Sequence, residues 1–154
     1  MRRTDGPFPV WEILAGQLYQ RGKLHSLPPD RKLDGLLHYG ITTMVTLAPT
    51  FPDPDLVRWE ETLFHYTHFP IPDGRLRAAE QLEGMAVMLA TTIRDGGTVL
   101  TMCNAGRNRS GLLSALIVRE LVGLSGSAAL AHVRVQRPEA IANPVFESFL
   151  RSLP

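Results

Sequence analysis

The sequence predicts an α/β domain with a central, mostly parallel sheet of about four to five strands and helices on both of its faces. Two observations lead to this fold class. Short runs of apolar and β-branched residues alternate with segments in which apolar residues recur every three or four positions, which is the pattern of strands alternating with helices. Glycine and proline residues are scattered between these segments and form no linker, so we expect residues 1–154 to form a single domain.

Strands alternate with short helices in the first half of the chain. Residues 11–18 are expected to be extended, either as a pair of short strands or as one lead-in segment. A helix over residues 31–39 has leucines on one face and stops at Gly40, because glycine readily adopts the backbone angles that end a helix. The other elements expected here are a buried strand over 41–47, a short helix over 55–63 and a strand over 65–70.

The second half contains the longest expected helix, over residues 76–94, whose apolar side chains recur at helical spacing. A core strand over 98–102 leads into a loop at 103–109. The helix expected over 110–122 is apolar almost all round, which predicts that it is buried. Two further helices are expected, one from Ser125 or Ser127 to about residue 135 and one from Asn143 or Pro144.

The composition excludes several functional classes. The formal net charge is +1, so there is no broad electrostatic attraction for nucleic acid. No window approaches the roughly 18 apolar residues of a membrane span, and no apolar run of a signal peptide follows the basic N-terminal residues. The single cysteine cannot form a disulfide within the chain. We therefore expect a cytoplasmic protein, and the sequence leaves its oligomeric state open.

The loop between the strand at 98–102 and the following helix can bind an anion, because ligands of such sheets bind where strand C-termini meet helix N-termini. Successive backbone N–H groups in a turn converge on negative charge, and the helix N-terminus adds its dipole. Gly106 permits a tight turn, and Arg109 offers a planar fork that matches two phosphate oxygens. Five residues are expected to bind the substrate together with Arg109: Asn104, Ala105, Gly106, Arg107 and Asn108.

Cys103 stands at the floor of this loop. A lone cysteine is often a buried and inert structural residue. Here Arg109 and Ser110 follow six and seven residues later, at a junction between a strand and a helix. A helix N-terminus and a nearby cation favour the nucleophilic thiolate. Together these features favour a catalytic cysteine over a structural one.

The Cys-x5-Arg-Ser segment with its internal glycine resembles the signature of the cysteine-based protein tyrosine phosphatase superfamily, and most closely that of its compact dual-specificity branch. The resemblance extends over most of the chain. It includes Ile71-Pro72-Asp73-Gly74 as the general-acid loop, Gly97-Thr98-Val99-Leu100 as the strand before the signature, and Arg137-Pro138 with Asn143-Pro144-Val145-Phe146 as the segment before the last helix.

This resemblance implies a phosphatase that requires no metal ion and no cofactor. It implies that Cys103 attacks phosphorus to form a phosphocysteine, and that Asp73 acts first as general acid and then as general base. Arg109 and the loop N–H groups would stabilise the charge on the phosphoryl oxygens, and Ser110 would hydrogen-bond the sulfur and help it leave. The implied substrates are phosphotyrosine, phosphoserine or phosphothreonine in proteins, or small phosphomonoesters.

The sequence departs from this family in front of the nucleophile, where Met102 replaces the usual histidine. Methionine offers no comparable hydrogen-bond donor, so we expect the thiolate to be less strongly stabilised than is usual. The acid loop reads Ile-Pro-Asp rather than Trp-Pro-Asp, which fits the dual-specificity branch and predicts a shallow pocket.

Other functions share the same loop. Phosphatases of phosphoinositides, inositol phosphates or RNA 5′-phosphates also use Cys-x5-Arg, and some have extra basic residues there, for which Arg107 is a candidate. A non-catalytic phosphate-binding pseudophosphatase would have lost the cysteine, the arginine or the acid, all of which are present here. Rhodanese-like sulfur carriers also cradle a cysteine, but typically in a shorter loop.

The sequence allows two interpretations of several other residues. Asp53 and Asp55 are rival acids or ordinary turn residues. Asn143 either orients the hydrolytic water or caps the last helix, and Arg137 is expected to tie the last helices to the loop. A metal site is not expected, because the only paired histidines, at 65 and 68, are three residues apart and face opposite sides of a strand.

Overall fold

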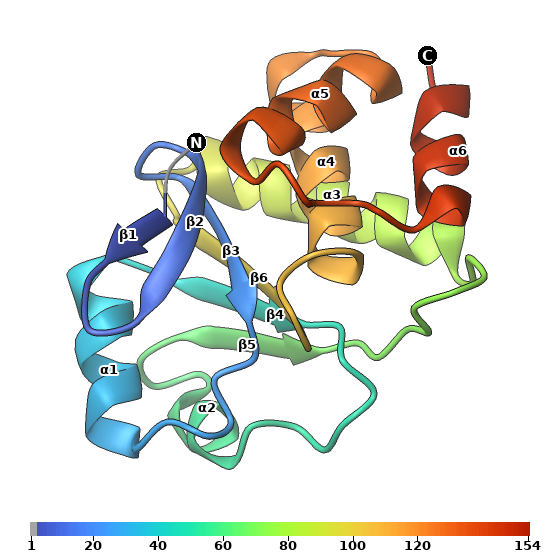
Figure 1. Cartoon of the computed structure of the whole chain (residues 1–154). Helices are drawn as coiled ribbons and strands as arrows, with labels where there is room; N and C mark the ends of the chain where they lie inside the picture. Colours follow the sequence, from blue (N-terminus) through green and yellow to red (C-terminus); the bar gives the residue numbers. More distant parts are fainter. Residues whose placement is uncertain (1–2) are drawn as a thin grey trace.

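The computed structural model describes residues 3–154, which form a six-stranded sheet covered by helices (Figure 1). The strands are β1 (Arg3–Asp5), β2 (Pro9–Leu14), β3 (Leu18–Gly22), β4 (Thr43–Thr46), β5 (His65–His68) and β6 (Val99–Cys103). Their order across the sheet is β1-β2-β3-β6-β4-β5. The β1–β2 and β2–β3 pairs are antiparallel, whereas β3, β6, β4 and β5 run parallel. The strand that ends at Cys103 therefore lies inside the sheet.

This arrangement confirms the predicted fold class, with one strand more than expected. The segment predicted as a strand pair or a single lead-in is a hairpin, in which β2 turns into β3 at Gly16. Gly16 has a φ of 69°, a left-handed conformation that glycine adopts readily. The additional strand is β1, and its three residues are too few to show the alternation that predicts a strand.

Helices cover both faces of the sheet, as predicted. They are α1 (Pro29–His38), α2 (Pro54–Trp59), α3 (Ala79–Arg94), α4 (Arg109–Val122), α5 (Gly126–Gln136) and α6 (Pro144–Ser152). Helices α1 and α2 lie on one side of the sheet, and α3 to α6 lie on the other (Figure 1).

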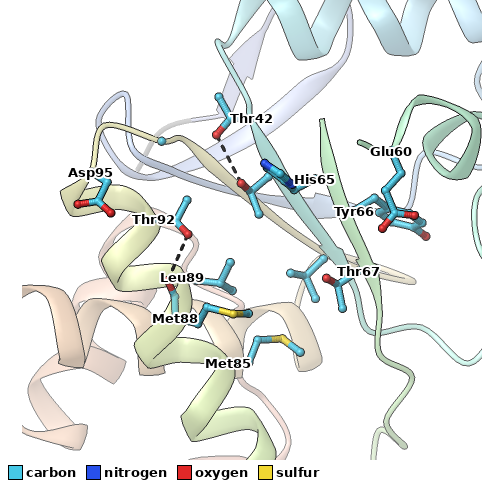
Figure 2. Close-up of a pocket in the computed structure, with 13 residues that line it drawn as sticks. Thr42, Glu60, His65, Tyr66, Thr67, Met85, Met88, Leu89, Thr92 and Asp95 are labelled. Atoms are coloured by element: carbon cyan, nitrogen blue, oxygen red, sulfur yellow. Dashed lines mark hydrogen bonds between the residues drawn. The ribbon is translucent and has the colours of Figure 1, made fainter. Parts of the chain in front are cut away.

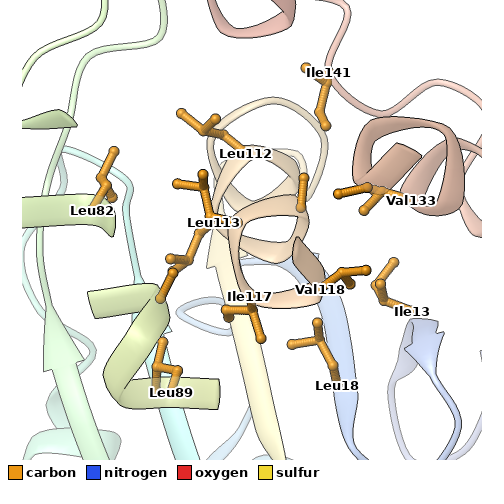
Figure 3. Close-up of a cluster of buried hydrophobic side chains, with 14 of the residues drawn as sticks. Ile13, Leu18, Leu82, Leu89, Leu112, Leu113, Ile117, Val118, Val133 and Ile141 are labelled. Carbon is orange, nitrogen blue, oxygen red and sulfur yellow. The ribbon is translucent and has the colours of Figure 1, made fainter. Parts of the chain in front are cut away.

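The larger hydrophobic core is centred on α4. Every residue of this helix from Arg109 to Val118 is buried, which confirms the prediction of a helix that is apolar almost all round. Ile117 and Val118 lie over Ile13 and Leu18 of the sheet (Figure 3). Burying each such aliphatic side chain stabilises the fold by about 1.5–3 kcal/mol, so the loop in front of α4 is attached to a rigid support.

Two helices are shorter than the sequence pattern predicts. The helix expected over 55–63 ends at Trp59, because Glu61 adopts a φ of 69° and Glu60 then pairs with Phe64 in a parallel bridge. The helix expected over 76–94 begins only at Ala79, because Ala78 adopts a left-handed φ of 58°.

Two predicted caps are present. Ser125 accepts a hydrogen bond from the N–H of Ala128 at the start of α5, and Asn143 accepts from two N–H groups at the start of α6. Such caps satisfy N–H groups that have no partner within the helix. Across residues 3–154, no single helix is long and apolar enough to cross a membrane, and α4 and α5 pass that test only together, with a bend of 118° between them.

Candidate active site

The expected nucleophile lies where β6 meets α4. All five residues of β6 are buried, and Cys103 is its last residue. Residues 104–108 form the connecting loop, and α4 begins at Arg109. The Sγ atom of Cys103 lies 3.2 Å from the Oγ atom of Ser110, which is itself fully buried. A hydroxyl at this distance can hydrogen-bond the sulfur.

The carbonyl groups of the loop point outward. The oxygen of Gly106 accepts from Nε2 of Gln20 at 3.0 Å and from Nε of Arg137 at 2.6 Å, and the oxygen of Ala105 accepts from Nη2 of Arg137 at 3.2 Å. In a planar trans peptide, the N–H group points opposite to the carbonyl. The N–H groups of the residues after Ala105 and Gly106 are therefore directed away from Gln20 and Arg137, as an anion-binding loop requires.

Gly106 has a structural reason to be glycine. Its φ is 63°, and a Cβ atom at this position would collide with the backbone of Arg21 and Gly22 in β3. The tight loop is therefore packed directly against the neighbouring strand, which fixes its shape.

Arg109 is buried, with 6% of its surface exposed. Its Nη1 donates to the carbonyl oxygen of Ile71 at 3.3 Å, while its Nε has no hydrogen-bond partner among the described residues. A buried guanidinium N–H without an acceptor is costly. An oxyanion bound in the loop would supply the missing acceptor.

Asp73 lies in an exposed turn after β5, and its carboxylate reaches back to the loop. Its Oδ2 accepts from Nδ2 of Asn108 at 3.2 Å, and its Oδ1 accepts from Nδ2 of Asn143 at 3.1 Å. The structure therefore brings Asp73 to the loop that begins at Cys103, although the two residues are 30 positions apart in the sequence.

The basic residues around the loop have separate contacts. Nε of Arg107 donates to the carbonyl oxygen of Glu139 at 2.8 Å, which directs this side chain toward the segment after α5. Arg137 holds the loop through the two carbonyl bonds described above and lies over the ring of Trp11, 4.7 Å from its centre. Arg137 therefore ties the end of α5 to the loop, in line with its expected place.

The rival acids have structural partners. Asp53 is fully buried and accepts two hydrogen bonds of 2.9 Å from Nζ of Lys32, while Asp55 accepts one of 2.8 Å from the same nitrogen. Asp53 also caps α2 by accepting from the N–H groups of Asp55 and Leu56. These contacts account for both carboxylates without a role in proton transfer.

Met102 belongs to the opposite side of the sheet from Cys103. Neighbouring residues of a strand point to opposite faces, and the buried side chain of Met102 joins the cluster on the α1 side, with Met44 and Leu24. Cys103 belongs to the cluster around α4. Met102 thus fills the core at a position from which it donates no hydrogen bond to the loop.

Sequence reasoning missed two contributors to the site. Gln20 is completely buried in β3, and its amide supports Gly106; an amide directly after the apolar Leu18 and Tyr19 was the available signal. Asn108 was expected to bind the substrate, but the contact of its side chain with Asp73 was not predicted. Across residues 3–154, no three His, Cys, Asp or Glu side chains are grouped so that they could hold a metal ion.

Two of the hollows that the described residues form lie outside the loop. One, of about 200 Å³, adjoins the outer side of the loop at Ala105 and is lined in part by Arg21 and Arg137. The other, of about 590 Å³, lies between α3 and β5 (Figure 2). Its lining includes His65 at the start of β5 and Asp95 just after α3, and no residue of the loop, so the larger hollow is separate from the candidate site.

Comparison with known structures identifies the class of fold. Tk-PTP in its active form has a TM-score of 0.77 and 28% sequence identity, over 94% of this chain and 95% of that one. The human tyrosine phosphatase-like serine/threonine/tyrosine-interacting protein has a TM-score of 0.73 and 25% identity, over 92% of this chain and 93% of that one. Human DUSP28 has a TM-score of 0.72 and 24% identity, over 92% of each chain.

The chain therefore has the fold of the cysteine-based protein tyrosine phosphatases. Its structural neighbours include Tk-PTP and dual-specificity phosphatases, in agreement with the resemblance seen in the sequence. No protein-family model matches the sequence, and no curated protein matches it at a significant level.

Proposed function

We propose that the protein is a cysteine-dependent phosphatase that hydrolyses phosphotyrosine, phosphoserine or phosphothreonine in proteins. The observation that carries this proposal is the unsatisfied, buried Nε of Arg109 in the loop that begins at Cys103. A phosphoryl oxygen is a natural acceptor for that group. The structural neighbours named as phosphatases support the same reaction class.

In the first step, the thiolate of Cys103 attacks phosphorus, and the bond from phosphorus to the substrate oxygen breaks. Asp73 gives its proton to that leaving oxygen, so a neutral alcohol or phenol departs and a phosphocysteine remains. Arg109 and the N–H groups of the loop stabilise the charge that develops on the three phosphoryl oxygens.

In the second step, water attacks phosphorus and gives a proton to the carboxylate of Asp73. The sulfur–phosphorus bond breaks, the thiolate is restored, and inorganic phosphate leaves. Ser110, 3.2 Å from the sulfur, stabilises the departing thiolate by a hydrogen bond. The charge is handled by Arg109 and the loop dipoles, and the mechanism uses no group beyond the chain and water.

Hydrolysis of a small aryl phosphate in the presence of a chelator tests this proposal. We expect turnover by the native chain, no turnover by Cys103→Ser, and a loss of about 10²-fold or more in kcat for Asp73→Asn. An unchanged rate in the Cys103→Ser variant would contradict the proposal. Gln17→Glu, an exposed change in the turn just before β3, serves as the control and should match the native chain.

The second substrate class left open by the sequence is a more highly charged phosphate ester, such as an inositol phosphate, a phosphoinositide or an RNA 5′-phosphate. The candidate for binding its additional charge is Arg107, whose guanidinium lies beside the loop and donates through Nε to the carbonyl oxygen of Glu139. Competition assays with a phosphopeptide and an inositol polyphosphate distinguish the two classes, because the preferred substrate will have the higher kcat/KM.

A third interpretation is a protein that binds phosphate without hydrolysing it. One structural neighbour is named as a phosphatase-like interacting protein. Binding of vanadate or phosphate together with no turnover at any pH would favour this interpretation over the phosphatase.

A further inference from the structure

Asn108 joins three segments of the site with one side chain. It is the residue directly before α4, and its Oδ1 accepts from the backbone N–H of Ala142 at 2.8 Å and of Asn143 at 3.2 Å. Its Nδ2 donates to Oδ2 of Asp73 at 3.2 Å. The phosphate-binding loop, the acid turn and the start of α6 therefore meet at this amide.

The orientation of this amide follows from its backbone partners. A carboxamide oxygen accepts hydrogen bonds, whereas its nitrogen only donates. Two N–H donors from residues 142 and 143 therefore hold Oδ1 on their side. The NH2 group must then face Asp73, and the usual uncertainty between the two ends of an asparagine amide is removed.

The amide of Asn143 is oriented in the same way and contacts the other oxygen of the Asp73 carboxylate. Its Oδ1 accepts from the N–H groups of Val145 at 2.9 Å and Phe146 at 3.4 Å, and so caps α6. Its Nδ2 donates to Oδ1 of Asp73 and to the carbonyl oxygen of Gly74, each at 3.1 Å. Each carboxylate oxygen of Asp73 thus receives one amide donor whose direction is set by backbone groups.

We propose that Asn108 is a positioning residue that holds Asp73 in its proton-transfer geometry before the substrate binds. This inference rests on the proposed phosphatase function. Asp73 belongs to no helix or strand and is exposed, so its own turn leaves it free to adopt several rotamers. Asn108 is adjacent in sequence to Arg109, and it therefore fixes the position of Asp73 relative to the residue that binds the phosphate.

Such positioning affects some substrates more than others. A poor leaving group must be protonated as its bond to phosphorus breaks, whereas a good leaving group can depart as an anion. An acid that is out of place therefore slows the hydrolysis of phenyl phosphate strongly and that of a nitrophenyl phosphate weakly. A purely structural defect would slow both substrates by the same factor.

The informative substitution is Asn108→Asp. Aspartate has almost the same shape and keeps an oxygen for the N–H groups of Ala142 and Asn143, but it replaces the donor to Asp73 with a negative oxygen. We expect kcat/KM for phenyl phosphate to fall about 10²-fold and the ratio of the nitrophenyl to the phenyl rate to rise at least about tenfold.

A double-mutant cycle with Asp73→Asn separates this effect from the added charge. Charge repulsion of the phosphate by Asp at position 108 acts in either background, whereas positioning of the acid acts only when Asp73 is present. We therefore expect Asn108→Asp to leave the leaving-group ratio unchanged in the Asp73→Asn background. Gln17→Glu introduces the same change of charge far from the site and should change no ratio.

The possible results are distinct. An unchanged leaving-group ratio in a folded Asn108→Asp variant, or an equal change in both backgrounds, would overturn the inference while the phosphatase function stands. Absence of turnover in the native chain would instead refute the proposed function. If Asn108→Asp fails to fold, Asn108→Ser is used, because serine can accept the backbone N–H groups but is too short to reach Asp73, and the same ratio decides.

Discussion

The buried guanidinium of Arg109 donates through Nη1 to the carbonyl oxygen of Ile71 at 3.3 Å, two residues before Asp73. The arginine proposed to bind phosphate is thus bonded to the backbone of the acid turn. The two Asn–Asp73 contacts add side-chain links to the same turn. The acid turn is therefore held to the loop at both its backbone and its carboxylate.

Replacement of Arg109 by lysine tests the importance of its fork. Lysine keeps the positive charge but offers a single point donor, which cannot bind two phosphoryl oxygens in one plane while also reaching Ile71. We expect kcat/KM to fall about 10²–10³-fold, and inhibition by vanadate to weaken. Arg107→Lys is the matched control, and a loss as large in that variant would contradict a special role for the fork of Arg109.

Replacement of Ser110 by alanine should slow the second chemical step. The hydroxyl lies 3.2 Å from the sulfur and stabilises the thiolate that leaves phosphocysteine. In rapid-mixing experiments we expect a burst of product about equal to the enzyme concentration, followed by turnover slowed about 10- to 100-fold, because one charge-assisted hydrogen bond of about 1.5–3 kcal/mol is lost. A variant without a burst would place the role of Ser110 in the first step.

Replacement of Lys32 by methionine should destabilise the fold. Lys32 is 1% exposed and neutralises the buried Asp53, and leaving such a charge unpaired costs about 3–5 kcal/mol. We expect the thermal midpoint to fall by about 10 °C, since 1 kcal/mol shifts a chain of this size by about 2–4 °C. The double variant Lys32→Met with Asp53→Asn keeps the helix cap and should recover part of the loss; no recovery would contradict the ion-pair explanation.

Tyr19 should make stability sensitive to alkaline pH. Burial and, next, the negative charge of Glu12 raise the pKa of this phenol above its ordinary value of 10.0. Because the unfolded chain then ionises at a lower pH than the folded one, the stabilisation from Tyr19 is complete below about pH 10 and is lost as pH rises through the folded pKa. Urea unfolding between neutral pH and strongly alkaline pH should therefore show a steeper decline for the native chain than for Tyr19→Phe, and parallel curves would contradict the shift.

The sequence predicted the helices and strands that show a clear pattern of apolar residues. The buried helix α4 and the strand β6 before it were found because both segments, of 14 and five residues, are rich in apolar side chains. The end of α2 at Trp59 was not found, because the positive φ of Glu61 is uncommon for a residue with a side chain. The short strand β1 was missed because three residues contain no period.

In the candidate site, residues within one segment could be predicted from the sequence, whereas contacts between distant segments could not. Cys103 and Arg109 stand at a fixed spacing in one segment, so the sequence itself places them together. The partners of Asp73 come from positions 35 and 70 residues away, and no spacing rule connects an amide to a carboxylate over such lengths. Gln20 donates to the carbonyl oxygen of Gly106 from 86 residues away. This contact follows from the pairing of β3 with β6, which the sequence does not predict.

Cys103 is the single sulfhydryl of the 154-residue chain. Any thiol-directed label that becomes attached to the native protein must therefore report on the floor of this loop. The stoichiometry of labelling counts competent sites directly, and the protection that vanadate gives against the label measures how well the loop is formed. By the same fact, a peroxide that converts this sulfur to sulfenic acid meets no second thiol in the chain, so the return to the reduced state depends on a reductant from solution.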